Sequence, residues 1–148
     1  MCIILQTSTQ VASYLIIFMT EKPKVIVIDD EPTNLDVLCE FLELNDVNVV
    51  ARGNNGFEAV QLFERHNPDI TLLDVAMPNY DGYFGLRGIL TLSKNAKVVM
   101  ITALGNSKMR EELLEFGAEE VLNKPFELNG VIEIIGEIMD KENIIANR

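Results

Sequence analysis

The residues of this chain that could do chemistry share one kind of position. Each follows, or ends, a short apolar run of the kind that forms a buried strand. They are Asp29, Asp30, Asp74, Thr102 and Lys124. In an open α/β sheet, the carboxyl ends of parallel strands meet at one edge, and ligands bind there. We therefore predict that these five side chains come together at one site.

Three carboxylates at one site repel one another, and the repulsion favours a proton or a cation among them. Oxygen ligands suit a hard ion, and a site with few protein ligands and room for water and phosphate suits Mg²⁺. Asp74 could act as a nucleophile, because carboxylates can form aspartyl phosphates. The Lys124 ammonium and the Thr102 hydroxyl could each contact a phosphoryl oxygen. Together these groups match the requirements of phosphoryl transfer.

Apolar runs alternate with amphipathic segments over residues 24–140. Strands are predicted at 25–28, 47–51, 69–73, 97–101 and 120–123. Helical spacing of apolar residues follows each of them, although Gly85 and Gly88 weaken the helix expected over about 82–92. Such alternation predicts a parallel sheet with right-handed crossovers and helices on both faces. The expected fold class is α/β, a flavodoxin-like doubly wound (βα)5 domain with strand order 2-1-3-4-5.

Composition indicates one globular domain. The chain has 148 residues and a formal net charge of −11, all of it carried by residues 21–148. Such an acidic domain would repel nucleic acid phosphates, so we expect no direct DNA binding. Cys2 and Cys39 form no disulfide or metal-binding pattern, which indicates a reducing, cytoplasmic location. His66 is the only histidine, which argues against imidazole-rich metal sites and a phosphohistidine supplied by the chain itself.

Residues 1–20 differ from the rest because they contain no charged side chain. Two apolar patches in this segment flank the polar residues 6–10, and neither patch is long enough to span a membrane. A basic region and a small-residue cleavage site, as found in signal peptides, are not evident. We interpret residues 1–20 as an extension outside a domain that spans 21–148, and we expect no membrane association.

Residues 24–140 resemble the receiver domain of two-component response regulators. Four motifs carry the resemblance: Val-Ile-Asp29-Asp30-Glu31, Leu-Leu-Asp74-Val-Ala-Met-Pro with Asp81-Gly82, Ile-Thr102-Ala, and Lys124-Pro-Phe. Each motif alone is weak, but their order and their placement after successive strands are specific.

The resemblance implies how these residues work. Asp74 would be phosphorylated from the phosphohistidine of a histidine kinase. Asp30, Asp74 and the backbone carbonyl of Ala76 would bind Mg²⁺, with Asp29 acting largely through water. The family also implies a cis peptide bond between Lys124 and the proline that follows it. Such a domain is a signalling domain and not an enzyme, since it catalyses only its own phosphorylation and dephosphorylation.

The sequence departs from the family at the position three residues before Lys124. Many receivers have an aromatic residue there, which turns inward on phosphorylation, whereas this chain has Val121. The aromatic part of the relay is therefore in doubt. Ala76 and Leu104 supply no polar side chain near the site, so we expect slow to moderate self-dephosphorylation.

Three functions fit these residues. The first is a stand-alone response regulator with no output domain, which signals through protein contacts. Its contact face would be the helix before Gly117, the strand at 120–123 and the last helix, and this face could also form a homodimer. The second is a phosphorelay intermediate that passes phosphate to a histidine phosphotransfer protein, which transfer assays would distinguish. The third is a haloacid-dehalogenase-like phosphatase, but Asp29 and Asp30 are adjacent, whereas that family needs an Asp-x-Asp motif.

Overall fold

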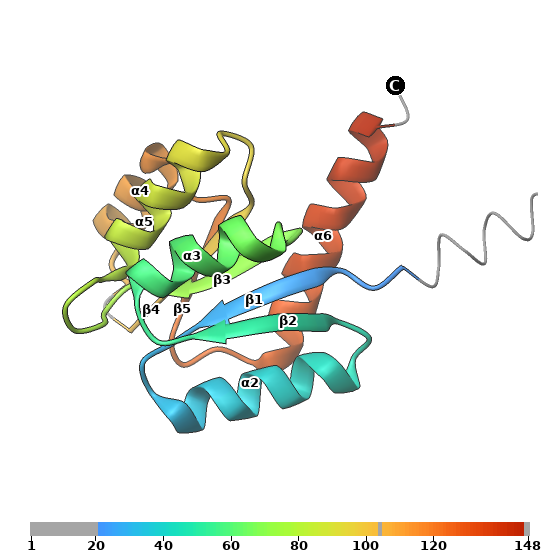
Figure 1. The fold of residues 1–148 in the computed structure, drawn as a ribbon, viewed down its shortest axis with the longest axis horizontal. Coiled ribbons are helices and arrows are strands. Elements are labelled where there is room, and N and C mark those ends of the chain that lie inside the picture. Colours follow the sequence, from blue (N-terminus) through green and yellow to red (C-terminus); the bar gives the residue numbers. More distant parts are fainter. Residues whose placement is uncertain (1–20, 104, 147–148) are drawn as a thin grey trace, which may run out of the picture.

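The computed structural model describes residues 21–103 and 105–146, so the predictions about residues 1–20 and Leu104 lie outside the described residues. In this part of the chain, five parallel strands form one sheet in the order β2-β1-β3-β4-β5, with a helix after each strand (Figure 1). This is the predicted fold. The elements are β1 (Lys24–Ile28), α2 (Pro32–Leu44), β2 (Asn48–Gly53), α3 (Gly56–His66), β3 (Ile70–Asp74), α4 (Gly82–Leu92), β4 (Val98–Thr102), α5 (Ser107–Phe116), β5 (Glu120–Asn123) and α6 (Leu128–Ala146).

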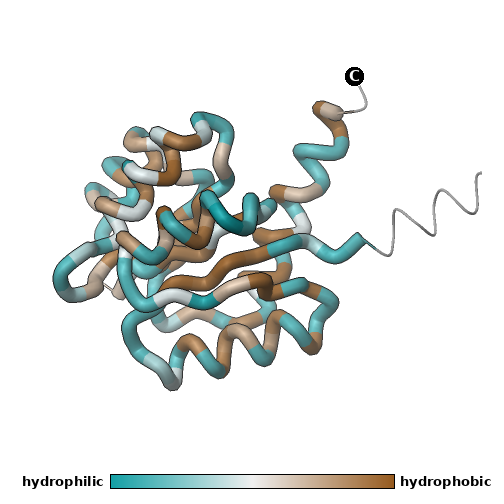
Figure 2. The backbone as a smooth tube through the Cα atoms, in the orientation of Figure 1, coloured by the Kyte–Doolittle hydropathy of each residue, from teal (hydrophilic) through white to brown (hydrophobic). Residues whose placement is uncertain are grey.

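The sheet separates two apolar layers because side chains alternate along each strand. Val25 and Val27 belong to the layer covered by α2 and α6, whereas Ile26 and Ile28 belong to the layer covered by α3, α4 and α5. Strands buried on both faces must be apolar at nearly every position. Figure 2 shows this as a hydrophobic band through the centre of the molecule.

Helix α4 forms over Gly82–Leu92, as predicted, despite its glycines. Asp81 caps it, because the Asp81 side chain accepts a hydrogen bond of 3.0 Å from the backbone N–H of Phe84. Gly85 allows α3 and α4 to pack closely. A Cβ atom at Gly85 would lie 3.0 Å from Leu73 Cδ2 and 3.2 Å from the Cα atom of Gly56. The low helix propensity of Gly85 therefore accompanies close packing, which a Cβ atom could enter only if its neighbours moved by a few tenths of an ångström.

The register of the sheet brings the strand ends to the same height. Asp74 pairs with Ile101, and Thr102 pairs with Asn123. Two strands lie one residue further along the chain than the sequence predicted, so that β3 ends with Asp74 and β4 ends with Thr102. Both residues are thus held by the sheet itself. No helix within residues 21–103 and 105–146 is long and apolar enough to cross a membrane.

Candidate functional site

Three carboxylates meet at the carboxyl ends of β1 and β3. Asp29 is 7% exposed and Asp74 5%, whereas Asp30 is exposed to solvent. One oxygen from each carboxylate lies within 4.8 Å of the others. An all-oxygen set with one open side fits a hard cation that keeps some of its water, as Mg²⁺ does. Their role as ligands remains a prediction.

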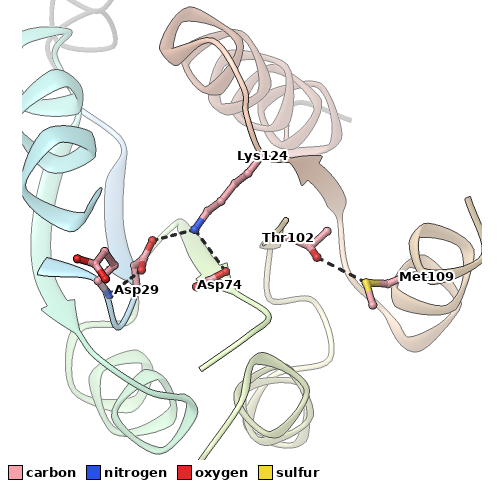
Figure 3. A network of polar contacts seen from close by, with 6 residues as sticks. Asp29, Asp74, Thr102, Met109 and Lys124 are labelled. Carbon is pink, nitrogen blue, oxygen red and sulfur yellow. Dashed lines mark hydrogen bonds and ion pairs between the residues drawn. The ribbon is translucent and has the colours of Figure 1, made fainter. Parts of the chain in front are cut away.

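Lys124 is the residue after β5, the edge strand, and its side chain extends toward the acids. Its Nζ atom lies 3.2 Å from Asp29 Oδ2 and 3.6 Å from Asp74 Oδ1 (Figure 3). The bond between Lys124 and Pro125 is cis, as the resemblance implied. The ammonium group therefore partly compensates for the negative charge of the two buried carboxylates.

Backbone contacts orient the acids. Asp29 Oδ1 accepts a hydrogen bond of 2.9 Å from the backbone N–H of Glu31, the residue before α2. Below Asp74, the chain turns back so closely that only glycine fits at position 82. A Cβ atom there would lie 2.3 Å from the carbonyl oxygen of Asp74 and 2.7 Å from the Cα atom of Val75. The Asp81-Gly82 motif is thus explained by helix capping and by close approach.

Burial raises the pKa of Asp74 from 3.8 to about 6. The Lys124 ammonium opposes this increase, and the negative charges of Asp29 and Asp30 add to it. The ionised form of Asp74 is therefore less favourable in the folded, metal-free protein than in the unfolded chain, even with Lys124 beside it. A bound cation would favour the ionised form, which is also the form that can act as a nucleophile.

We expect the metal-free protein to lose stability as the pH rises through about 6. The folded-state pKa of Asp74 is higher than its unfolded value of 3.8, so the folded protein binds the proton more tightly. The protonated Asp74 carboxyl contributes fully to stability below its unfolded pKa. This contribution is lost as the pH rises through the folded pKa, which lowers the free energy of unfolding by about 2–3 kcal/mol. Asp74→Asn should remove this loss. Urea unfolding in EDTA at pH 4.5 and 7.5 would measure it, and an unchanged pH dependence in the variant would contradict the assignment.

Thr102 lies at the end of β4 and is 1% exposed. Its hydroxyl donates a hydrogen bond to Met109 Sδ in α5, at 3.5 Å. In Figure 3, Met109 lies on the opposite side of Thr102 from Asp74. The sequence predicted Thr102 at the site but did not predict this contact with Met109.

The structure also shows where Ala76 and Val121 lie. Ala76 lies exposed in the loop after β3, two residues beyond Asp74, and the binding of Mg²⁺ by its carbonyl stays a prediction. Val121 is 3% exposed and belongs to the apolar layer beneath α3, α4 and α5. Its carbonyl accepts a hydrogen bond of 2.6 Å from Arg110 Nη1.

A largely apolar groove of about 520 Å³ opens beside the site, between α2 and the start of α6. Asp29 and Lys124 line its polar end, and Val37, Leu38 and Phe126 contribute to its apolar wall. Val37 is 51% exposed on the side of α2 that lines this groove. The groove therefore provides an apolar contact surface next to the acids.

Comparison with known proteins identifies relatives over most of the chain. Residues 25–136 match the model of the response regulator receiver domain. The chemotaxis protein CheY of Bacillus subtilis is 29% identical over 117 residues, which cover 79% of this chain and 98% of that protein. CheY of Listeria monocytogenes is 33% identical over 112 residues, which cover 76% of this chain and 94% of that protein.

Solved structures of receiver domains and CheY proteins are also similar to this chain. The CheX–CheY–BeF3–Mg²⁺ complex from Borrelia burgdorferi contains a chain with a TM-score of 0.77 and 30% identity, and the match covers 82% of this chain and 93% of that one. A CheY-like receiver from Methanospirillum hungatei has a TM-score of 0.76 at 22% identity, covering 83% of this chain and 98% of that one, and so shows the fold.

Proposed function

The chain belongs to the response regulator receiver domain family, and we propose that it is a stand-alone, cytoplasmic phosphorylation switch. Asp74 accepts a phosphoryl group from a histidine kinase in a Mg²⁺-dependent reaction. The observation that carries the proposal is the buried Asp74 carboxylate, grouped with Asp29 and Asp30 and 3.6 Å from the Lys124 ammonium. As a receiver, the domain signals and is not a conventional enzyme.

In the transfer step, an Asp74 carboxylate oxygen attacks the phosphorus atom of a phosphohistidine. A P–O bond forms, the P–N bond breaks, and the electron pair returns to the imidazole nitrogen. Bound Mg²⁺, held by Asp29, Asp30, Asp74 and the Ala76 carbonyl, would neutralise charge on the transferring phosphoryl oxygens.

Lys124 and Thr102 act on the product. Lys124 already lies between Asp29 and Asp74, so a small movement of its flexible side chain would bring the ammonium to a phosphoryl oxygen. The Thr102 hydroxyl would donate to a second one. Each bond is made to a charged oxygen and is therefore stronger than a neutral hydrogen bond.

Partners are proposed from the surfaces beside the site. The groove between α2 and α6 opens at Lys124, so a phosphohistidine-bearing helix that packs an apolar face there would bring its histidine toward the acids. Output would pass through protein contacts on α5, β5 and α6, a face that could also form a homodimer. The Borrelia burgdorferi CheY structure, a complex with CheX, supports the expectation that a domain of this fold binds protein partners.

The test is incubation with Mg²⁺ and acetyl phosphate, followed by intact mass spectrometry. We expect the mass to increase by one phosphoryl group, and we expect EDTA to prevent the increase. The bond should be labile to hydroxylamine, as an acyl phosphate is. Labelling that persists in EDTA, or no labelling by either acetyl phosphate or a phosphorylated histidine kinase, would contradict the proposal. Transfer from labelled protein to histidine phosphotransfer proteins would instead favour a phosphorelay intermediate.

A further inference from the structure

The hydroxyl of Thr102 has an acceptor in α5 and would meet a competing acceptor after phosphorylation. In this structure it donates to Met109 Sδ, a weak acceptor, at 3.5 Å. After phosphorylation of Asp74, a charged phosphoryl oxygen would be a far stronger acceptor. A hydroxyl has a single proton to donate, so the two hydrogen bonds exclude each other. The hydroxyl of Thr102 therefore marks two states of the protein.

Met109 ties that choice to the first turn of α5. The Met109 backbone N–H donates to the Asn106 side chain at 2.8 Å, which caps the helix. Its side chain packs against the apolar layer that contains Val121. Met109 thus contacts the helix cap through its backbone and the apolar layer through its side chain, so its hydrogen bond connects Thr102 to this turn.

The next residue attaches the same turn to β5. Arg110 donates to the Val121 carbonyl at 2.6 Å and forms an ion pair with Glu120. Val121 occupies the position where many receivers have an aromatic residue, and it is 3% exposed within the apolar layer. Valine has no ring that could turn inward, and a change of its χ1 rotamer would move only two methyl groups. The Thr102–Met109 contact is an alternative route by which Thr102 could act on α5.

We propose that Met109 is the relay residue of this chain: it holds the Thr102 hydroxyl in the unphosphorylated state and releases the first turn of α5 when the hydroxyl turns to the phosphoryl group. This inference rests on the proposed phosphorylation of Asp74. In this proposal, the Met109 thioether on α5 connects the phosphorylation site to the surface of the domain. In many receivers an aromatic residue at the position of Val121, on β5, is expected to make this connection.

Met109→Leu is the critical variant, because it keeps the apolar volume and removes the acceptor. Met100→Leu is the matched control, since Met100 is a buried methionine of the same apolar layer. Hydrogen exchange of the peptide that covers α5 would be measured by mass spectrometry before and after labelling with acetyl phosphate and Mg²⁺. Intact mass would report the phosphorylated fraction of the same samples.

In the wild type and in Met100→Leu, we expect phosphorylation to speed hydrogen exchange in the first turn of α5 by about three- to fivefold. This is the change in rate that corresponds to losing the free energy of one weak hydrogen bond. In Met109→Leu, exchange should already be fast before labelling, so that the ratio falls to about one while the phosphorylated fraction stays high. A wild-type ratio in Met109→Leu, or the same loss in Met100→Leu, would overturn the relay alone. No mass increase in the wild type would overturn the proposed function, and the relay with it.

Discussion

Asp74→Asn should abolish phosphoryl uptake, with labelling by acetyl phosphate and Mg²⁺ falling about a thousandfold or more, to background. The amide has no charge to attack phosphorus, and it cannot form the acyl phosphate. The substitution is nearly isosteric, and it removes a buried carboxylate whose ionisation is unfavourable. The variant should therefore be at least as stable as the wild type at neutral pH, and loss of labelling could not be attributed to unfolding.

Asp46→Asn is the matched control for this experiment. Asp46 is exposed, precedes β2 at the opposite edge of the sheet, and has a positive φ of 62° that asparagine tolerates. Among the residues that the structure describes, its side chain forms a single, solvent-exposed ion pair, with Lys22. Labelling of this variant should equal that of the wild type. Labelling that survives in Asp74→Asn would move the phosphorylation site to another residue.

Asp30→Ala should weaken Mg²⁺ binding by at least about tenfold. The Asp30 carboxylate lies within 4.8 Å of its neighbours in Asp29 and Asp74, yet Asp30 itself is exposed. Its removal would therefore delete a proposed ligand without leaving a cavity or a buried unpaired group. Isothermal titration calorimetry with MgCl₂ at pH 7.5 would measure the change in affinity.

Glu31→Ala provides the control, because it removes one negative charge from the next residue. Glu31 is exposed, and its side chain makes no capping hydrogen bond to α2. Its loss should change Mg²⁺ affinity only slightly, by general electrostatics that added salt would screen. Equal losses in both variants would show that Asp30 acts through its charge and does not contact the ion.

The sequence predicted the fold and the meeting of the acids because both depend on patterns that span whole elements. Buried parallel strands are apolar throughout, so five such runs with helical segments between them define the sheet. Once the order is known, Asp29, Asp30, Asp74 and Lys124 must end at one edge. The cis bond before Pro125 came from resemblance alone, and no local pattern in the chain requires it.

Predictions at the level of single contacts were weaker. The sequence ended β3 before Asp74 and β4 before Thr102, because polar residues resemble loop residues, whereas ladder hydrogen bonds continue through both. It treated Gly85 as a weakness in a helix, since the neighbouring helix is not visible in local propensity. It could not find the Thr102–Met109 contact, which depends on a rotamer and on the loop that joins two elements.

The two apolar layers also determine which partners can be bound at the same time. The groove at α2 opens on one face of the sheet, and the relay at Met109 lies among the helices of the other face. A phosphodonor in the groove would not cover the first turn of α5. A target that recognises the released turn could then associate with the phosphorylated protein before the donor has dissociated, so the donor's residence time need not limit the response.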